Sequence, residues 1–502
     1  MENEPLIMAI DIGTTSVKCL IIDEQGLTIN TASKGYPISS PYPNWLEQNP
    51  EDWWTAAAQT IMKCSKELNL EQVAVVSLSG HMSAPVLIGQ EGKPLMPSIL
   101  IADTRTSKQT AYLRSHFLNK FTTSTGNEPL DAFTASKLLW VKEEYPEVLK
   151  KATNFFFPKD YIRYKLTNKI GTDPTDAGNS LLFDLAGEDW NWEMINELGL
   201  PVSLFPELFG TASVFGQVTE EAARQTGMKA GTPVVTGGAD MACSQAGTGA
   251  TKHGTMAITL STSGQIVMGV SKPEANGIGK VTYHPGAAAG SVYAMGSVFA
   301  GGLGVEWAYK LLNNKRSMDA SDYEELARLT EEMKKYPVGS NGLLFLPFLV
   351  GSGSPHFNAK DRASWIGLTL NQDKALLLRS VLEGITYNIV ENVNLIKGMG
   401  TEIEKVFLGA GGSRNPVWCK MIADALGMDV SVLANRDGSA LGAAIIGGVG
   451  IGMFSSIEEA VEKLVKSETT ISFDVENHLQ YKKFFARYQN IYQALNEHAV
   501  SR

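Results

Sequence analysis

The sequence predicts an α/β protein built from two domains. The chain has 502 residues, which is too long for a single domain with one ordinary hydrophobic core. Its composition, 44% hydrophobic and 19% charged, is typical of a well-packed globular protein. Each half also begins with the same pattern, two short apolar runs joined by a turn of glycine and hydroxyl residues. We therefore expect one domain over residues 1–250 and a second over 251–502.

The first domain should open with a β-hairpin, because residues 6–12 and 17–23 are apolar runs separated by GTTS. Residues 72–80 form an apolar run typical of a buried strand, which ends just before His81 and Met82. Helices are expected around 106–118 and over 136–152, and the second has core positions at Leu138, Leu139, Val141 and Val148.

Residues 229–249 predict a strand, a double-glycine turn and a helix that begins near Asp240. The second domain then repeats the opening pattern, with a hairpin over 255–270. Glycine turns follow at 300–304, 350–357 and 408–415, and the last of these precedes an amphipathic helix that runs through Leu426. The second half is therefore expected to be built like the first.

The charge of the chain disfavours nucleic-acid and membrane partners. A net charge of −10 disfavours binding to nucleic acid or an anionic membrane, since both require clustered Lys and Arg. The acidic start of the chain does not resemble a signal peptide, and no segment approaches the roughly 20 apolar residues that cross a bilayer. We expect a cytoplasmic protein.

The four cysteines are far apart and show neither a disulfide framework nor a zinc-site spacing.

The first hairpin carries groups suited to phosphate and magnesium. In DIGTTSVK, Asp11 ends one strand, Thr14 and Thr15 provide hydroxyls, and Lys18 lies in the returning strand. Backbone N–H groups and hydroxyls hold phosphate oxygens, and a carboxylate binds Mg²⁺ directly or through water. The alternative is an ordinary tight turn, which can have the same sequence.

The second hairpin offers a matching turn, with Thr262, Ser263 and Gly264 in LSTSGQ. A lone STSG is more often an ordinary turn than a ligand site. Two such turns in one chain, however, could hold a triphosphate from opposite sides.

Several motifs together resemble the FGGY carbohydrate kinases, most closely their xylulokinase branch, over nearly the whole chain. They are DIGTTSVK, WLEQNPEDWW (45–54), SKLLW (136–140), GGADMACSQAGTG (237–249), STSG, FLPFLVGSGSPHFNAKDRASWIGLTL (345–370), RSVLEG (379–384), LGAGGSRN (408–415), ADALG (423–427) and ALGAA (440–444). The resemblance implies two actin-like (ribonuclease-H-like) domains around a central cleft, with sugar bound mainly by the first and ATP by the second.

The resemblance also assigns roles to single residues. Asp240 matches the catalytic base that takes the proton from the attacking sugar hydroxyl, although without the family it reads equally well as a helix N-cap. Asp11 matches the carboxylate linked to magnesium. The positions that match ATP-binding positions are Thr14, Thr15, Lys18, Thr262, Ser263, Gly264, Gly302, Gly411, Gly412 and Asn415. Each of these glycines, taken alone, could simply be a turn or a helix cap.

The sugar-binding positions are His81, Met82 and Asp103, together with Asp240. Asp103 lies where xylulokinases have the Asp of Trp-Asn-Asp-x-Arg, with different flanking residues, and could instead cap a turn. Xylulokinases usually carry Gly-Gln-Met-His-Gly where this chain has 80–84, GHMSA. His81 therefore stands at the Gln position and Ser83 at the His position, which rearranges donors and acceptors facing a sugar. A lone His is more often structural, but this location favours a substrate contact.

The sequence thus predicts an ATP- and Mg²⁺-dependent kinase for a small sugar or polyol, D-xylulose first and ribulose, a pentitol, glycerol or gluconate next. The phosphorylated hydroxyl stays open, and a homodimer is only the default for such families. An actin- or chaperone-like ATPase could share the fold. The sequence GGAD, the xylulokinase-like residues around His81 and the lack of an added filament- or client-binding domain argue against it. A catalytically weak sugar sensor is disfavoured because Asp11, Asp240 and both turns are present.

Overall fold

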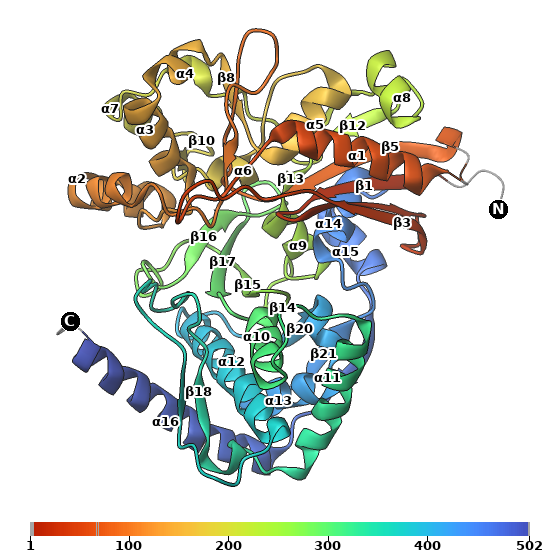
Figure 1. Ribbon diagram of the computed structural model, residues 1–502. Coiled ribbons are helices and arrows are strands. Elements are labelled where there is room, and N and C mark those ends of the chain that lie inside the picture. The colour runs from red at the N-terminus through yellow and green to blue at the C-terminus, as the bar shows by residue number, and fades with distance from the viewer. Residues whose placement is uncertain (1–4, 67, 69, 500–502) are drawn as a thin grey trace.

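The computed structural model describes residues 5–66, 68 and 70–499 and contains one seven-stranded sheet in each half of the chain (Figure 1). The first sheet consists of β1 (Leu6–Ile12), β2 (Ser16–Ile22), β3 (Thr28–Gly35), β5 (Val73–Gly80), β11 (Val214–Gln217), β12 (Pro233–Val235) and β13 (Gly238–Ala239). The second consists of β14 (Thr255–Leu260), β15 (Gly264–Val270), β16 (Thr282–Pro285), β17 (Val292–Val298), β20 (Lys405–Gly409), β21 (Val430–Leu433) and β22 (Ser467–Ile471).

The two sheets share one topology at their centres. In the first, β1 pairs antiparallel with β2, β2 antiparallel with β3, β1 parallel with β5, and β5 parallel with β12. In the second, β14, β15, β17, β20 and β21 repeat the same order and directions. Both predicted hairpins and the strand over 72–80 are confirmed. The repeated order confirms the expected α/β fold of two ribonuclease-H-like domains.

Helices cover these sheets. In the first half they are α1 (Pro50–Ser65), α2 (Ser107–Thr125), α3 (Thr134–Glu144), α4 (Pro146–Lys151), α5 (Pro158–Thr167), α6 (Pro174–Gly178), α7 (Trp192–Glu197), α8 (Glu220–Thr226) and α9 (Asp240–Gly247). In the second half they are α10 (Gly302–Leu312), α11 (Ala320–Glu332), α12 (Lys374–Lys397), α13 (Pro416–Leu426), α14 (Gly438–Gly450), α15 (Ile457–Leu464) and α16 (Val475–Ala499). Among the residues described, none of these helices has the length and apolar character needed to span a membrane.

Small elements complete the chain. Within the described residues, two-stranded ribbons are formed by β4 (Glu47–Gln48) with β7 (Ser98–Ile99), β6 (Val86–Ile88) with β8 (Asn154–Phe156), β9 (Phe183–Asp184) with β10 (Asp189–Trp190), and β18 (Leu344–Leu346) with β19 (Ser364–Ile366). Single 3-10 turns lie at Leu70–Gln72, Val202–Leu204, Met333–Lys335, Ser340–Gly342 and Gly411–Arg414. All four cysteines are buried and free.

The helix predicted over 136–152 is wrong as a single element. The structure has α3 and α4, separated at Tyr145. Proline has no N–H to donate and disfavours helical backbone in the residue before it, so the first helix ends and the second begins at Pro146. The apolar positions of α3 are buried as expected, and Val148 of α4 is half-buried against the same core.

The two halves meet through α9 and α14, which lie between the sheets in Figure 1. Helix α14 belongs to the second half of the chain, yet it packs on β1 and β5 of the first sheet and shares a core with Ile7, Val75 and Cys243. The two helices approach closely, because a Cβ at Gly442 would lie 1.7 Å from the Cys243 carbonyl oxygen. Helix α9, which begins at Asp240, is therefore packed against residues of both halves.

Candidate active site

Three strand ends of the first sheet bring the predicted catalytic residues to one edge. Asp11 of β1 lies opposite Ser79 of β5, and β13 pairs with the same end of β5 on its other side. Asp240 follows β13 directly, and His81 follows β5. Since β1, β5 and β13 run parallel, their carboxyl ends meet at the edge where ligands bind in open α/β sheets.

The first hairpin turn is held by two residues from outside the hairpin. The Gln48 amide donates to the Thr14 carbonyl at 2.9 Å, and the Tyr36 backbone N–H donates to the Thr15 carbonyl at 3.2 Å. The Tyr36 hydroxyl donates to the Gly13 carbonyl. These contacts satisfy three carbonyls of the turn and fix its shape. The sequence motif identified the turn but not Tyr36 or Gln48, which lie 23 and 34 residues away from their partners.

Lys18 forms an ion pair that links the two halves of the chain. Its Nζ lies 2.6 Å from Oδ1 of Asp437, the residue immediately before α14, and both side chains are partly exposed. The neighbouring Arg436 carbonyl accepts a hydrogen bond from the Ala410 N–H at 3.3 Å. The segment 435–438 therefore contacts both the first hairpin and the glycine turn that follows β20. Sequence reasoning missed Asp437; the RDG turn before a small-residue helix was the available signal.

The carboxylates of Asp11 and Asp240 are both strongly perturbed. Burial and, to a lesser extent, the negative charge of Asp11 raise the pKa of Asp240 to about 7, while a hydrogen bond from the Met241 N–H acts in the opposite direction. Burial likewise raises the pKa of Asp11, opposed by Ser79 and Lys18. Oδ1 of each is buried with no hydrogen-bond partner among the described residues. Two buried carboxylate oxygens at one strand edge suit a proton acceptor and a hard cation such as Mg²⁺.

Asp240 is the first residue of α9, but its side chain does not cap the helix. The N-cap residue is Ala239, which carries no side-chain cap. The alternative interpretation of Asp240 as an N-cap therefore does not account for its carboxylate.

His81 lies in the same region as a buried, neutral imidazole. It is 2% exposed, its backbone N–H donates to the Ile12 carbonyl at 2.8 Å, and its ring meets Trp53 edge-on at 5.2 Å. Burial, followed by the charge of Lys137, lowers its pKa to about 3. Neither ring nitrogen has a hydrogen-bond partner within the described part of the chain. Buried polar atoms are normally paired, so this ring has donor and acceptor capacity to offer a ligand.

Met82 and Ser83, the two residues that follow His81, make contacts within the protein. Met82 is buried in a small cluster with Ala239, Ala242 and Tyr293. Ser83 donates from its hydroxyl to the Asn179 carbonyl at 3.0 Å, and its own carbonyl accepts from Lys137 Nζ at 2.8 Å. Ser83 thus serves internal contacts rather than presenting a free hydroxyl.

Asp103 is fully buried, and its carboxylate is occupied. Both oxygens accept from Arg105, with the shortest distance 2.6 Å to Nη2, and Oδ2 also accepts from the Leu46 N–H at 2.6 Å. Arg105 in turn pairs with Glu47 at 3.0 Å and stacks on Trp45 at 3.7 Å. These contacts place Asp103 in a support for the loop that carries it.

The predicted ATP positions of the second domain gather at the ends of β14 and β20. Thr259 of β14 pairs with Gly409, so the turn 261–264 and the turn 410–415 lie at one edge. Gly302 begins α10 and donates to the Ser261 carbonyl at 2.7 Å, where a Cβ would lie 2.7 Å from the same oxygen. Gly302 therefore supports the turn through close backbone packing.

The remaining positions differ in exposure. Gly411 faces open space, whereas a Cβ at Gly412 would lie 2.7 Å from the Leu260 side chain. Asn415 caps α13, accepting from the Trp418 N–H at 3.1 Å. Thr262 is exposed and Ser263 half-buried. Exposed hydroxyls and backbone at a strand edge are groups that can hold phosphate oxygens.

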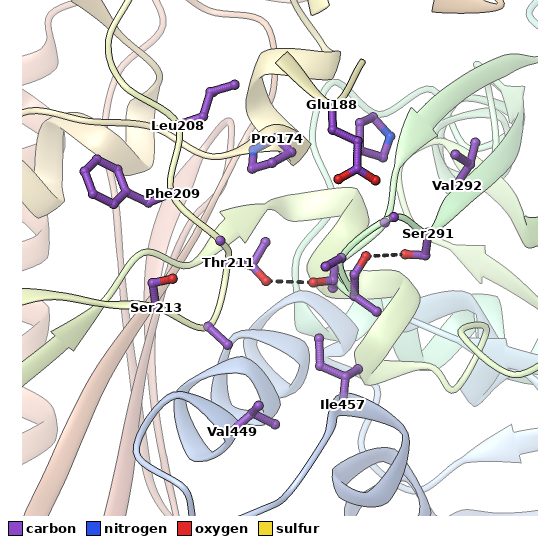
Figure 2. A pocket seen from close by; sticks show the side chains of 18 of the residues that line it. Pro174, Glu188, Leu208, Phe209, Thr211, Ser213, Ser291, Val292, Val449 and Ile457 are labelled. Atoms are coloured by element: carbon purple, nitrogen blue, oxygen red, sulfur yellow. Dashed lines mark hydrogen bonds between the residues drawn. The ribbon is translucent and has the colours of Figure 1, made fainter. Parts of the chain in front are cut away.

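A separate cavity of about 820 Å³ opens between the halves and is shown in Figure 2. Its walls are the segments 208–213 and 285–292, joined by a hydrogen bond from the Thr211 hydroxyl to the Ala287 carbonyl at 2.6 Å. None of the predicted site residues lines it. The chemistry suggested by Asp11, His81 and Asp240 therefore belongs to the strand edge and not to this cavity.

Comparisons with known proteins agree with this architecture. Residues 6–247 match the N-terminal domain of the FGGY family of carbohydrate kinases, and residues 251–451 match its C-terminal domain. A xylulose kinase of Bacillus subtilis (strain 168) is 33% identical over 491 residues, which is 97% of this chain and 96% of the relative. A gluconokinase of the same organism is 30% identical over 472 residues, 92% of this chain and 90% of the relative.

The crystal structure of xylulose kinase from Rhodospirillum rubrum is also similar. It has a TM-score of 0.87 and 27% identity, and the match covers 98% of this chain and 99% of that chain. The family models, the full-length relatives and the strand-edge carboxylates agree. The chain belongs to the FGGY family of carbohydrate kinases.

Proposed function

We propose that this carbohydrate kinase transfers the γ-phosphoryl group of ATP to a ketopentose, with D-xylulose as the first candidate. The observation that supports this most is Asp240, a half-buried residue with a pKa of about 7 whose Oδ1 is buried and has no hydrogen-bond partner among the described residues, at the strand edge shared with Asp11 and His81. The similarity to xylulose kinases over 97% of the chain supports the choice of sugar.

In the proposed reaction, Asp240 takes the proton of the attacking sugar hydroxyl. The hydroxyl oxygen forms a bond to the γ-phosphorus, the bond to the bridging oxygen breaks, and ADP leaves. Phosphoryl transfer needs little from the protein beyond this proton acceptor, alignment and neutralisation of charge. A pKa near 7 keeps a useful fraction of Asp240 ionised at neutral pH while making it a stronger base than an exposed Asp.

The cofactors would be held at both strand edges. The hydroxyls of Thr14, Thr15, Thr262 and Ser263, the backbone at Gly264 and the ammonium of Lys18 would bind the phosphates, with Gly411, Gly412 and Asn415 near the adenosine and Gly302 behind the turn. Asp11 would hold Mg²⁺, which when bound neutralises charge on the phosphates. In this proposal residues 1–250 bind the sugar mainly and residues 251–502 the nucleotide mainly.

The electrostatics of the edge favour an uncharged sugar. Asp11 and Asp240 contribute negative charge, and His81 is neutral because burial lowers its pKa to about 3. An acid such as gluconate would bring its carboxylate toward these groups without a cation from His81 to receive it, and the nearby Lys137 ammonium already donates to the Ser83 and Ala132 carbonyls. Neutral ketopentoses and pentitols are therefore preferred over gluconate.

The experiment is a substrate panel. Purified protein with Mg·ATP is assayed for ADP release with D-xylulose, D- and L-ribulose, L-xylulose, pentitols, glycerol and gluconate. We expect one ketopentose to give the highest kcat/KM, with gluconate at least about tenfold lower, as one unfavourable charge contact predicts. Stimulation by gluconate alone would reject the proposed substrate, and strong ADP release without any sugar would favour an ATPase.

His81 is predicted to contribute to sugar binding. Replacing it with Ala should raise KM for the sugar about three- to tenfold, the effect of losing one hydrogen bond, and leave KM for ATP unchanged. The matched control is His116→Ala, because His116 is exposed on α2. An unchanged sugar KM in the His81 variant would assign His81 to packing against Trp53 instead.

The pH dependence should report the ionisation of Asp240. The base must be deprotonated, and its pKa lies near 7 rather than at the ordinary 3.8. With both substrates subsaturating, kcat/KM should therefore fall about tenfold per pH unit below pH 7 and level off above it. A profile that stays flat down to pH 5 would contradict the assignment of this pKa to the catalytic base.

A further inference from the structure

A buried ion cluster lies directly behind the strand edge, and nothing in the proposed reaction yet uses it. We call Lys159, Asp160, Arg163, Asp173 and Asp176 the ion cluster. All five are at most 1% exposed. Lys159 Nζ contacts the carboxylates of Asp160 at 2.6 Å, Asp173 at 2.5 Å and Asp176 at 2.9 Å, and Arg163 pairs with Asp160 at 2.9 Å.

The ion cluster is not a metal site. The oxygens of Asp160, Asp173 and Asp176 lie within 4.8 Å of one another, the arrangement that could hold a cation. The ammonium of Lys159, however, contacts all three carboxylates and takes the place that a cation would occupy. Burial raises the pKa of Asp176 well above its ordinary value, which reduces the negative charge to be balanced. Lys159 and Arg163 therefore balance the charge of these carboxylates without a metal.

The ion cluster reaches the segment that carries Asp240 at two points. Arg163 donates from Nη1 to the Thr236 carbonyl at 2.6 Å. Asp173 accepts from both the backbone N–H and the hydroxyl of Thr175, and the Thr175 hydroxyl oxygen accepts from the Ala239 N–H at 2.8 Å. Both ends of 236–239, the four residues before Asp240, are therefore bound to the cluster, one directly and one through Thr175.

The segment has little room to move between these two points. Gly237 has a φ of +78°, and a Cβ there would lie 2.2 Å from the Leu78 carbonyl oxygen of β5. A Cβ on Gly238 would lie 3.2 Å from the Thr175 hydroxyl. Gly80, the last residue of β5, packs closely on the ion cluster, because a Cβ at Gly80 would lie 2.9 Å from the backbone nitrogen of Lys159. The cluster, β5 and the segment 236–239 form one tightly packed unit.

We propose that Arg163 and Thr175 are positioning residues, through which the ion cluster holds the segment 236–239 and thereby sets the position of the Asp240 carboxylate. This inference rests on the proposed function, in which Asp240 is the base. None of the cluster residues touches the substrate in this account. Their effect on rate comes from the alignment of Asp240, and a displacement of about 1 Å in such a group can lower the rate about a hundredfold.

The decisive pair of variants is Thr175→Val and Thr175→Ser. Valine keeps the shape and removes the hydroxyl that accepts from Ala239, whereas serine keeps the hydroxyl. We expect kcat to fall about tenfold or more in Thr175→Val with both KM values within threefold of wild type, and Thr175→Ser to restore kcat. If the valine variant does not fold, Arg163→Lys removes the contact with Thr236 while keeping a cation beside Asp160.

Amide hydrogen exchange separates this inference from the proposed function. Peptides covering 233–243 should exchange faster in Thr175→Val than in wild type or Thr175→Ser, whether or not a sugar substrate has been found. Unchanged exchange would overturn the inference. So would faster exchange accompanied by full kcat in the folded variant. The proposed function fails if Asp240→Asn keeps full activity or if no sugar stimulates the wild type. In either case the hydrogen-exchange result still decides whether the ion cluster holds the segment 236–239.

Discussion

Replacing Asp240 with Asn is expected to lower the sugar-dependent rate of ADP formation by about 10²- to 10⁴-fold, the range that general base catalysis contributes. Asn has nearly the same shape but cannot accept the proton, so KM values for sugar and ATP should change little. The measurement is steady-state kinetics with the best sugar of the panel, together with nucleotide binding to show that the ATP site is intact.

The same variant provides its own control for folding. The unfolded Asp240 ionises near 3.8 and the folded one near 7, so the folded state opposes ionisation and loses stability as pH rises from 3.8 to 7. Above pH 7 the wild type has lost all of the stability that depends on this pKa difference, whereas the variant loses none because Asn does not ionise. Asp240→Asn should therefore melt at the same or a higher temperature than wild type at pH 8. Full activity in a variant that binds ATP would exclude Asp240 as the base.

Replacing Asp103 with Ala is expected to destabilise the protein by about 3–5 kcal/mol, the usual effect of removing one partner from a buried ion pair. The reason is that Arg105, which is 1% exposed, would keep Glu47 as its one ion-pair partner among the described residues, and the Leu46 N–H would lose its acceptor. The measurement is urea unfolding followed by tryptophan fluorescence, which reports on this region because Arg105 lies over Trp45 and Trp140. The urea concentration at the midpoint of the transition should be lower in the variant than in wild type.

The control for this prediction is Glu325→Gln, which breaks an exposed pair with Arg328 on α11 and should leave the midpoint unchanged. The kinetics of Asp103→Ala decide between the two interpretations of Asp103. A raised sugar KM with unchanged stability would restore direct sugar binding, as the xylulokinase-like motif predicts. Lower stability with an unchanged sugar KM in the folded fraction would establish the supporting role.

The parts of the fold that could be predicted from the sequence are those determined by local pattern. The turns GTTS and STSG lie between apolar runs whose strand period and glycines specify a hairpin, and both hairpins were found at the expected residues. The helix that runs through Leu426 was also predictable, since Asn415 caps its start, Pro416 is its first residue and Gly427 ends it with a φ of 65°.

The missed features depend on contacts between distant residues. The turn-cap alternative for Asp103 is confirmed, because its Oδ1 accepts from the Arg105 N–H at 2.9 Å. The hydrogen bond from the Leu46 N–H to its Oδ2, however, joins residues 57 positions apart and could not be predicted. Asp437 follows Lys18 by 419 residues in the chain, so no window of sequence connects them. Helix α14 returns to the first sheet because its small residues fit against α9, a fit that depends on how both halves fold. These are tertiary effects that propensity and pattern do not encode.

The most direct test of the central claim is to follow the fate of the γ-phosphoryl group. Phosphorus NMR of wild-type protein with Mg·ATP and D-xylulose would record ADP, inorganic phosphate and any sugar phosphate in one sample. The proposed mechanism predicts a sugar phosphate that accumulates in a one-to-one ratio with ADP, little inorganic phosphate, and no reaction in Asp240→Asn. Inorganic phosphate equal to ADP, with no phosphorylated product from D-xylulose or any other sugar of the panel, would contradict it.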